Sequence, residues 1–313
     1  MNPRQQLAAI KQHLAAPAVV APMFLVSGPE MVIAGYRAGL IGAFPAPNAR
    51  DISILENWLE QITAAVGEPV TGDIRGSWAL NLVVHRTYER LPQELELVKK
   101  YQPPMVITAL GSPRAVVETV HGYGGLVIAD VNSIEYARKA AEWGVDGLAL
   151  VSAGAGGHTG DITGFTFIPA VRKFFDGIII AAGGICNGQG VRAAEVLGAD
   201  LAYMGTRFIA TDESLASPEY KAMLVAAGPK DLVLTNSFTG ANAYYLRDSI
   251  VKAGLDPDNL EAKAGMDLGG YDAKAWKDIW SAGPTAQTVD SIAPVGVVAA
   301  EIAAQYRAAK NIP

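Results

Sequence analysis

The chain has 313 residues, enough for one large α/β domain or a domain with an elaboration. Half of the residues are hydrophobic and 18% are charged, which excludes an intrinsically disordered protein. A net charge of −6 argues against nucleic acid or an anionic membrane as a partner, and no apolar run is long enough to span a membrane. The single cysteine, Cys186, excludes an intrachain disulfide, and the N-terminus shows no signal-peptide pattern, so a cytoplasmic protein is expected.

Short apolar runs alternate with helix-like segments over most of the chain. The runs predict strands at residues 19–23, 40–44, 78–84, 105–108, 126–130, 147–151, 177–182 and 201–204. The segments between and after them predict helices at residues 27–38, 54–66, 92–101, 112–121, 133–143, 166–175, 188–197 and 218–227. Two of these helices are expected to begin with a capping box, at Ser27-x-x-Glu30 and at Ser53-x-x-Glu56.

Eight strands that each precede a helix match the count of a (β/α)8 TIM barrel. The runs are nearly continuously apolar, as expected of parallel strands that are buried on both faces. The alternative is an open, doubly wound sheet, which normally shows a G-x-G-x-x-G fingerprint after its first strand. Residues 19–29 contain no such fingerprint, so the barrel is favoured.

Beyond residue 228 the regular alternation stops. Residues 236–240, 265–270 and 276–280 predict helices with long connections, and residues 292–309 predict an Ala-rich final helix. We therefore expect an inserted C-terminal helical lid subdomain at residues 228–290, over the mouth of the barrel. The barrel itself would comprise residues 1–227 together with the final helix within residues 291–313.

Glycines follow the last two predicted strands of the barrel. Gly183 and Gly184 lead through Asn187 to a helix N-terminus, and Gly205 and Thr206 follow the next strand. Barrels often bind a phosphate group between these two loops, through backbone N–H groups and a helix dipole. The alternative is that these are ordinary turn glycines, but their position at the strand ends favours a phosphate site.

A third glycine-rich loop contains a histidine. Gly154, Gly156, Gly157 and His158 follow the predicted sixth strand. Because an imidazole titrates near neutrality, His158 is the candidate for acid–base chemistry, and a histidine that merely caps a turn is the alternative. No grouping of His, Cys, Asp and Glu has the spacing of metal ligands, so no metal is expected.

With these motifs in place, the chain resembles the nitronate monooxygenase family, formerly called 2-nitropropane dioxygenases. The matching segments are Ala21-Pro22-Met23, Asn81 in its strand, Ala155-Gly156-Gly157-His158, Ala182-Gly183-Gly184-Ile185, residues 204–208 and residues 280–283. The resemblance implies a barrel that binds FMN. The FMN contacts that it implies are Ala21, Pro22, Met23, Asn81, Asp130, Ala155, Gly156, Gly157, Gly183, Gly184, Met204, Gly205 and Thr206. His158 would face the flavin ring as the catalytic base or as a group that orients the substrate.

The resemblance also implies a reaction. Alkyl nitronates would be oxidised by O2 to a carbonyl compound and nitrite, and His158 would remove the α-proton where neutral nitroalkanes are used. The partners would be a small-molecule substrate and O2, with a homodimer left open. One alternative is an FMN-dependent NAD(P)H reductase of a quinone or an enoyl thioester on the same fold. Another is a flavin-free isomerase or lyase that acts on a phosphorylated metabolite.

The chain departs from the family pattern near the site. Val151 and Gly154 stand where many members have Gln and Glu, and Pro284 stands where many have Gln. Asp130 stands where the quinone reductase branch has Lys, and an anion there would not stabilise the negative charge of a reduced flavin. The sequence therefore predicts a flavin site but leaves its substrate open.

Overall fold

The computed structural model describes residues 2–67, 74–263 and 277–312, and in these ranges eight parallel strands close into a barrel. Their order around the barrel is β1-β2-β3-β4-β5-β6-β8-β9. The strands are β1 (Ala18–Val20), β2 (Ile41–Pro45), β3 (Ser77–Val83), β4 (Met105–Ala109), β5 (Leu126–Val131), β6 (Gly147–Val151), β8 (Ile178–Ala182) and β9 (Leu201–Met204). The predicted TIM barrel is confirmed, and the open sheet is excluded.

Alternation along each strand divides the core into an inner and an outer layer. Ile128 of β5 and Leu201 of β9 point into the barrel, where they join one apolar cluster. Their neighbours Val127 and Ala202 point outward, into clusters that the surrounding helices cover. Leu7 of α1 (Pro3–Lys11) also joins the inner cluster, so α1 packs against the barrel interior.

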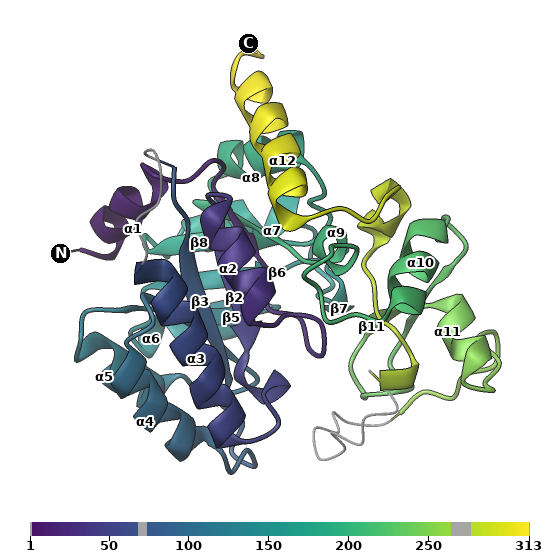
Figure 1. Cartoon of the computed structure of the whole chain (residues 1–313), viewed down its shortest axis with the longest axis horizontal. Coiled ribbons are helices and arrows are strands. Elements are labelled where there is room, and N and C mark those ends of the chain that lie inside the picture. The colour runs from purple at the N-terminus through teal and green to yellow at the C-terminus, as the bar shows by residue number, and fades with distance from the viewer. Residues whose placement is uncertain (1, 68–73, 264–276, 313) are drawn as a thin grey trace.

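The helices that cover the barrel follow the strands as predicted, with one short addition at residues 206–209 that was not predicted. They are α2 (Pro29–Arg37), α3 (Ile52–Gly67), α4 (Leu91–Tyr101), α5 (Arg114–His121), α6 (Ile134–Glu142), α7 (Gly164–Arg172), α8 (Gly188–Val196), α9 (Thr206–Ile209), α10 (Pro218–Ala226) and α12 (Val295–Lys310). The final helix, α12, packs against α8 and α2, as Figure 1 shows for α8.

Both predicted capping boxes are wrong. The N-cap of α2 is Gly28, which makes no side-chain cap bond, because the Ser27 hydroxyl accepts the Met23 N–H at 3.0 Å instead. Helix α3 begins earlier than expected, and the Asp51 carboxylate accepts the Ile54 N–H at 2.9 Å. A carboxylate two residues upstream therefore takes the place predicted for Ser53.

The segment between α10 and α12 contains more strand than expected. Strands β10 (Leu232–Thr235) and β11 (Ala243–Leu246) form an antiparallel hairpin, and β11 also pairs with β7 (Gly157–His158). We call these three strands the lid sheet. Residues 236–240, which were predicted to be helical, connect the two hairpin strands instead. The chain continues into helix α11 (Arg247–Lys252) and later into a short 3-10 helix, η3 (Pro284–Thr288).

Figure 1 shows α10, α11 and β11 gathered beside the barrel, to the right of the view. The helix predicted at residues 265–270 lies outside the described residues, as does the first residue of the one predicted at 276–280. The boundaries proposed for a separate lid subdomain, after residues 227 and 290, stay predictions.

Candidate active site

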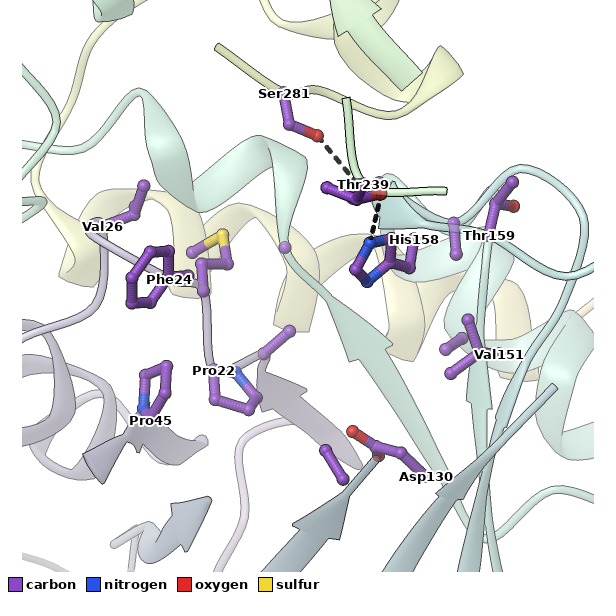
Figure 2. Close-up of a pocket in the computed structure, with 18 of the residues that line it drawn as sticks. Pro22, Phe24, Val26, Pro45, Asp130, Val151, His158, Thr159, Thr239 and Ser281 are labelled. Carbon is purple, nitrogen blue, oxygen red and sulfur yellow. Dashed lines mark hydrogen bonds between the residues drawn. The ribbon is translucent and has the colours of Figure 1, made fainter. Parts of the chain in front are cut away.

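A cavity of about 1460 Å³ lies at the C-terminal ends of the barrel strands and reaches the lid sheet. It exceeds the roughly 300–1,000 Å³ of ordinary ligand pockets. Figure 2 shows His158 and Thr239 on one side of this space and Asp130 on the other. Of the residues predicted for the site, those that line the cavity are Ala21, Pro22, Met23, Asn81, Asp130, Ala155, Gly156, Gly157, His158, Gly183, Gly184, Gly205 and Thr206.

Met204 is the predicted site residue that does not line the cavity. Its side chain is 1% exposed and joins the cluster between the barrel and its outer helices. The preceding residue of β9, Tyr203, points inward and lines the cavity. The expectation for Met204 therefore missed the strand alternation by one residue.

One of the two loops predicted to bind phosphate, at Gly183 and Gly184, has backbone conformations that only glycine adopts readily. Gly183 has a φ of 115° and Gly184 a φ of 72°, so both lie in the left-handed region. The Gly184 N–H donates to the Gly154 carbonyl at 3.1 Å, which joins this loop to the histidine loop. A Cβ at Gly184 would meet no atom within 4 Å, so open space adjoins the backbone there. The loop at Gly183 and Gly184, together with Gly205 and Thr206, is called the glycine cradle. It therefore has room for a bound group.

Helix α8 offers fewer free N–H groups to the glycine cradle than predicted. Its Gly188 N–H donates to Gln305 Oε1 at 3.0 Å, and its Gly190 N–H donates to Asn187 Oδ1 at 2.8 Å. Side chains thus already satisfy two of the N–H groups at this helix start. Gly183, Gly184, Gly205 and Thr206 line the cavity, and a phosphate held between their loops stays a prediction.

Three loops meet so closely at one edge of the cavity that glycine is required. A Cβ on Gly156 would lie 2.9 Å from the Gly283 nitrogen and 3.0 Å from Thr206 Oγ1. The Gly283 N–H donates to Thr206 Oγ1 at 3.0 Å. The 280–283 segment singled out in the sequence therefore closes the cavity against the histidine loop and the end of β9.

The loop after β1 is held by residues that sequence reasoning missed. The buried Asn48 side chain donates to the Met23 carbonyl at 2.9 Å and to the Ser27 carbonyl at 2.7 Å. Its Oδ1 accepts the Leu25 N–H at 2.8 Å, at a residue with a φ of 61°. Asn48 therefore fixes the backbone that presents Pro22 and Met23. The available signal was its position just after the second strand.

His158 lies on β7, and its backbone pairs with Ala243 of β11. Its Nε2 is 2.9 Å from Thr239 Oγ1, in the loop between β10 and β11. Burial lowers the pKa of the imidazole, so the neutral form, which can accept a proton, dominates at neutral pH. Thr239 could not be found from sequence, because only the folded hairpin brings it to His158.

Ser281 connects the same elements from the other side. Its hydroxyl accepts the Gly157 N–H at 3.0 Å and donates to the Tyr244 carbonyl at 2.7 Å. The Tyr220 hydroxyl donates to the Ser281 carbonyl, and the Tyr220 ring stacks on Trp280 with centroids 5.1 Å apart. The lid sheet is thus fastened to α10 and to the 280–283 segment.

Asp130 is the last residue of β5 whose side chain points into the barrel, and this side chain has an unusual environment. Its Oδ1 atom is buried and has no hydrogen-bond partner among the described residues, and the same holds for the hydroxyl of Tyr203. Burial raises the pKa of the Asp130 carboxyl to about 7. The pKa of Tyr203 is also raised, first by burial and then by the charge of Asp130. A carboxyl at this position is therefore close to half protonated at neutral pH.

At Gly154, which departs from the family pattern, the backbone conformation itself favours glycine. Gly154 has a φ of 89°, which a Glu at the same position would adopt only under strain. Val151 ends β6 and also lines the cavity. Both departures from the family pattern therefore lie in the wall of the cavity.

Among the residues that the structure describes, no three His, Cys, Asp or Glu side chains are grouped so as to hold a metal ion. Likewise, none of the described helices is long and apolar enough to cross a membrane.

The matching segments recognised in the sequence thus converge on one cavity, and a comparison with known families agrees. Residues 44–268, more than half of the chain, match the family described as nitronate monooxygenase. The chain belongs to the nitronate monooxygenase family. Members of this family are FMN-dependent oxidoreductases, so the predicted enzyme class and cofactor are confirmed at the level of the family.

One curated relative is the (3aS,4S,5R,7aS)-5-hydroxy-7a-methyl-1-oxo-octahydro-1H-indene-4-carboxyl-CoA dehydrogenase of Rhodococcus jostii (strain RHA1), 26% identical over 237 residues. The match covers 76% of this chain and 64% of the relative, so the chain spans a little under two thirds of that protein's length.

Two solved structures share the fold. Nitroalkane oxidase from Streptomyces ansochromogenes has a TM-score of 0.77 and 24% identity, over 96% of this chain and 99% of that one. FabK from Thermotoga maritima has a TM-score of 0.75 and 23% identity, over 95% of this chain and 94% of that one. These likenesses concern the fold and not the substrate.

Proposed function

We propose that this chain is an FMN-dependent enzyme that oxidises alkyl nitronates with O2 to a carbonyl compound and nitrite. The observation that carries the proposal is the position of His158. A neutral imidazole lines the same cavity as the glycine loops that fit the cofactor phosphate. FMN, when bound, supplies the route by which electrons leave the substrate and reach O2. The protein positions the substrate and handles its proton.

The hydrogen bonds around Thr239 suggest which nitrogen of His158 is basic. The Thr239 hydroxyl has one proton and lies 3.2 Å from the Ala241 carbonyl, to which it donates. In the tautomer in which this hydroxyl accepts from His158 Nε2–H, the basic lone pair lies on Nδ1. In this arrangement Nδ1 takes the α-proton of a nitroalkane, whereas a preformed nitronate needs only to be oriented.

The second candidate is an FMN-dependent NAD(P)H reductase of a quinone or an enoyl thioester. The cavity volume of about 1460 Å³ favours it, because a small nitronate does not need so much space beside a flavin. The relative from Rhodococcus jostii is named as a dehydrogenase of a CoA ester, which also fits a larger substrate.

Anaerobic mixing of the FMN-loaded protein separates the two candidates. Propionate 3-nitronate is expected to bleach the flavin absorption, and NADH and NADPH are expected to leave it unchanged. Bleaching by NADH or NADPH with no response to the nitronate would replace the first proposal by the second. A protein that cannot be reconstituted with FMN would contradict both.

A further inference from the structure

The active-site cavity extends along helix α6, beyond the ends of the barrel strands. Tyr136 and Ala140 of this helix and its C-cap residue, Trp143, all line the cavity. They follow one another at intervals of four and three residues, which places them on one face of a helix. One face of α6 therefore forms a wall of the cavity over most of the length of the helix.

The space beside this wall is a gap between α5 and α6. Elsewhere around the barrel, α4 packs against both α3 and α5, and α6 packs against α7. Helices α5 and α6, by contrast, come close to one another at hardly any point. Leu110 and Ser112, in the loop that leads from β4 to α5, also line the cavity. We call the part of the cavity that is lined by Leu110, Ser112, Tyr136, Ala140 and Trp143 the side groove.

Leu110 has an unfavourable backbone conformation at the edge of the side groove. Its φ is 69°, in the left-handed region, where a leucine is strained. Strain of this kind is concentrated at functional sites, where the surrounding structure holds it in place. Here it accompanies a half-buried apolar side chain in the wall of the cavity. A strained leucine that is kept in a cavity wall indicates that the cavity binds an apolar group.

The side groove presents aromatic surface, and the cation beside its outer ring is already paired. Tyr136 is 55% exposed, so a bound group could cover much of its ring. Lys139 Nζ lies 5.5 Å from the centroid of this ring and pairs with Glu135 at 2.6 Å. The Arg114 guanidinium lies 6.0 Å from the Trp143 ring, and the methylenes of such side chains add apolar surface. A neutral, apolar chain fits this surface, and an anionic nucleotide attracted by Arg114 is the alternative.

We propose that the side groove binds the alkyl chain of a long-chain nitronate while the reacting carbon of the same molecule lies beside His158. This inference rests on the proposed oxidation of nitronates and names the class of substrate. It accounts for a cavity of about 1460 Å³ in an enzyme whose reacting group is small. Binding energy from a chain that is remote from the reacting carbon raises kcat/KM.

The test measures nitrite release by the FMN-loaded protein from nitronates of straight-chain primary nitroalkanes, from nitroethane to nitrooctane. In the wild type, kcat/KM should be about fifteenfold higher for nitrooctane than for nitrobutane, roughly twofold for each methylene that the half-open groove covers. Ser112→Trp fills the groove and should bring this ratio close to one, with the value for nitroethane unchanged. Ala115→Trp, at an exposed residue of α5 outside the cavity lining, is the matched control and should keep the wild-type ratio.

A second variant, Tyr136→Ala, removes part of the wall without filling the groove and should lower the ratio about threefold. Because the ratio compares two substrates of one preparation, partial unfolding of a variant does not change it. A wild type that oxidises the nitronate of nitroethane but gains nothing along the series would overturn the inference and leave the proposed function standing. An unchanged ratio in both Ser112→Trp and Tyr136→Ala would also overturn it.

The nucleotide alternative is tested with ADP as the probe. ADP should not inhibit the wild type, and inhibition that Ser112→Trp relieves would assign the side groove to a nucleotide and overturn the inference. If the FMN-loaded wild type oxidises no nitronate of any length, the proposed function falls together with the inference.

Discussion

On the barrel side, the wall of the cavity includes exposed glycine backbone, whereas the lid side presents the imidazole of His158. On the barrel side, Gly183 and Gly184 hold left-handed conformations that expose their main chain to the cavity. On the lid side, β7 and β11 hold His158, and Thr239 contacts its imidazole. The two sides are joined by main-chain contacts such as the bond from the Gly184 N–H to the Gly154 carbonyl.

This difference separates two tasks in space. Groups that would bind the cofactor belong to the barrel, and the group that would handle the substrate proton belongs to a small sheet outside it. Substitutions on the two sides should therefore fail in different ways. Changes on the barrel side should reduce FMN binding, and changes on the lid side should reduce turnover while FMN stays bound.

The largest effect is expected at His158. His158→Ala should reduce turnover of a neutral nitroalkane by roughly 10²–10⁴ and leave FMN binding intact, because proton transfer is lost while the cradle is not touched. His85→Ala, at a histidine that does not line the cavity, is the control for steady-state assays. Equal turnover in wild type and His158→Ala, with both nitroalkane and nitronate, would remove His158 from the reaction. Because burial lowers the His158 pKa, wild-type nitroalkane turnover should persist through the usual titration range of histidine and fall only in more acid solution, as the base becomes protonated.

The second effect concerns the stability of the apo protein and arises on the barrel side. The Asp130 pKa is about 7 when folded and near 3.9 when unfolded, so the folded state binds more protons between these values. The free energy of unfolding should therefore fall as pH rises from about 4 to 7, by up to roughly 4 kcal/mol from this group. Asp130→Asn should lack this decline relative to the wild type in urea unfolding at a series of pH values. Parallel pH profiles for the two proteins would show that Asp130 ionises normally.

A smaller effect separates two consequences of replacing a cradle glycine, which are backbone strain and weaker FMN binding. Gly184 and Gly124 both have positive φ, and a Cβ at either would meet no atom within 4 Å. Replacement of either by Ala should cost about 1–2 kcal/mol of stability through backbone strain. Only Gly184→Ala should also weaken FMN binding, about tenfold, because its methyl group projects into the cavity. Equal FMN affinity in both variants, measured by fluorescence quenching, would place the phosphate elsewhere.

The smallest effect is expected where the lid sheet orients the histidine. Thr239→Val keeps the shape of the side chain but removes the hydroxyl that contacts His158 Nε2. Turnover of a nitroalkane should fall about fivefold to tenfold, the worth of one hydrogen bond, with FMN affinity unchanged. Thr235→Val, on the neighbouring strand and outside the cavity lining, is the matched control. A loss of FMN in Thr239→Val would contradict the separation of the two sides.

The barrel could be predicted because its strands are buried on both faces and therefore appear as continuous apolar runs. Strand β6 (Gly147–Val151) and strand β9 (Leu201–Met204) were predicted at their observed bounds. Most of the residues predicted at the strand ends line the cavity, since ligands bind at strand ends in this fold, and their contacts with FMN stay predictions. Tyr203 could also have been chosen over Met204 by following the inward alternation from Leu201.

The lid sheet could not be predicted, because β7 has only two residues, one of them glycine. Its pairing with β11 joins positions more than eighty residues apart and leaves no periodic pattern. The same reason hides Thr239 and Ser281, whose roles depend on contacts formed after folding. Ser27 failed as a helix cap because its hydroxyl bonds to Met23, which no local rule anticipates.

Because β7 pairs with β11, the hairpin beside the cavity is joined to the strand that contains His158. His158 shares its ladder position with Ala243, so a displacement of the hairpin would carry the imidazole away with it. An enzyme that admitted its substrate by lifting this hairpin would remove its own base at the same moment. The base would return only when the sheet closed again over the ligand. The uncovered flavin would then meet water without a proton acceptor beside it, and the site could not act on a substrate that it had not enclosed.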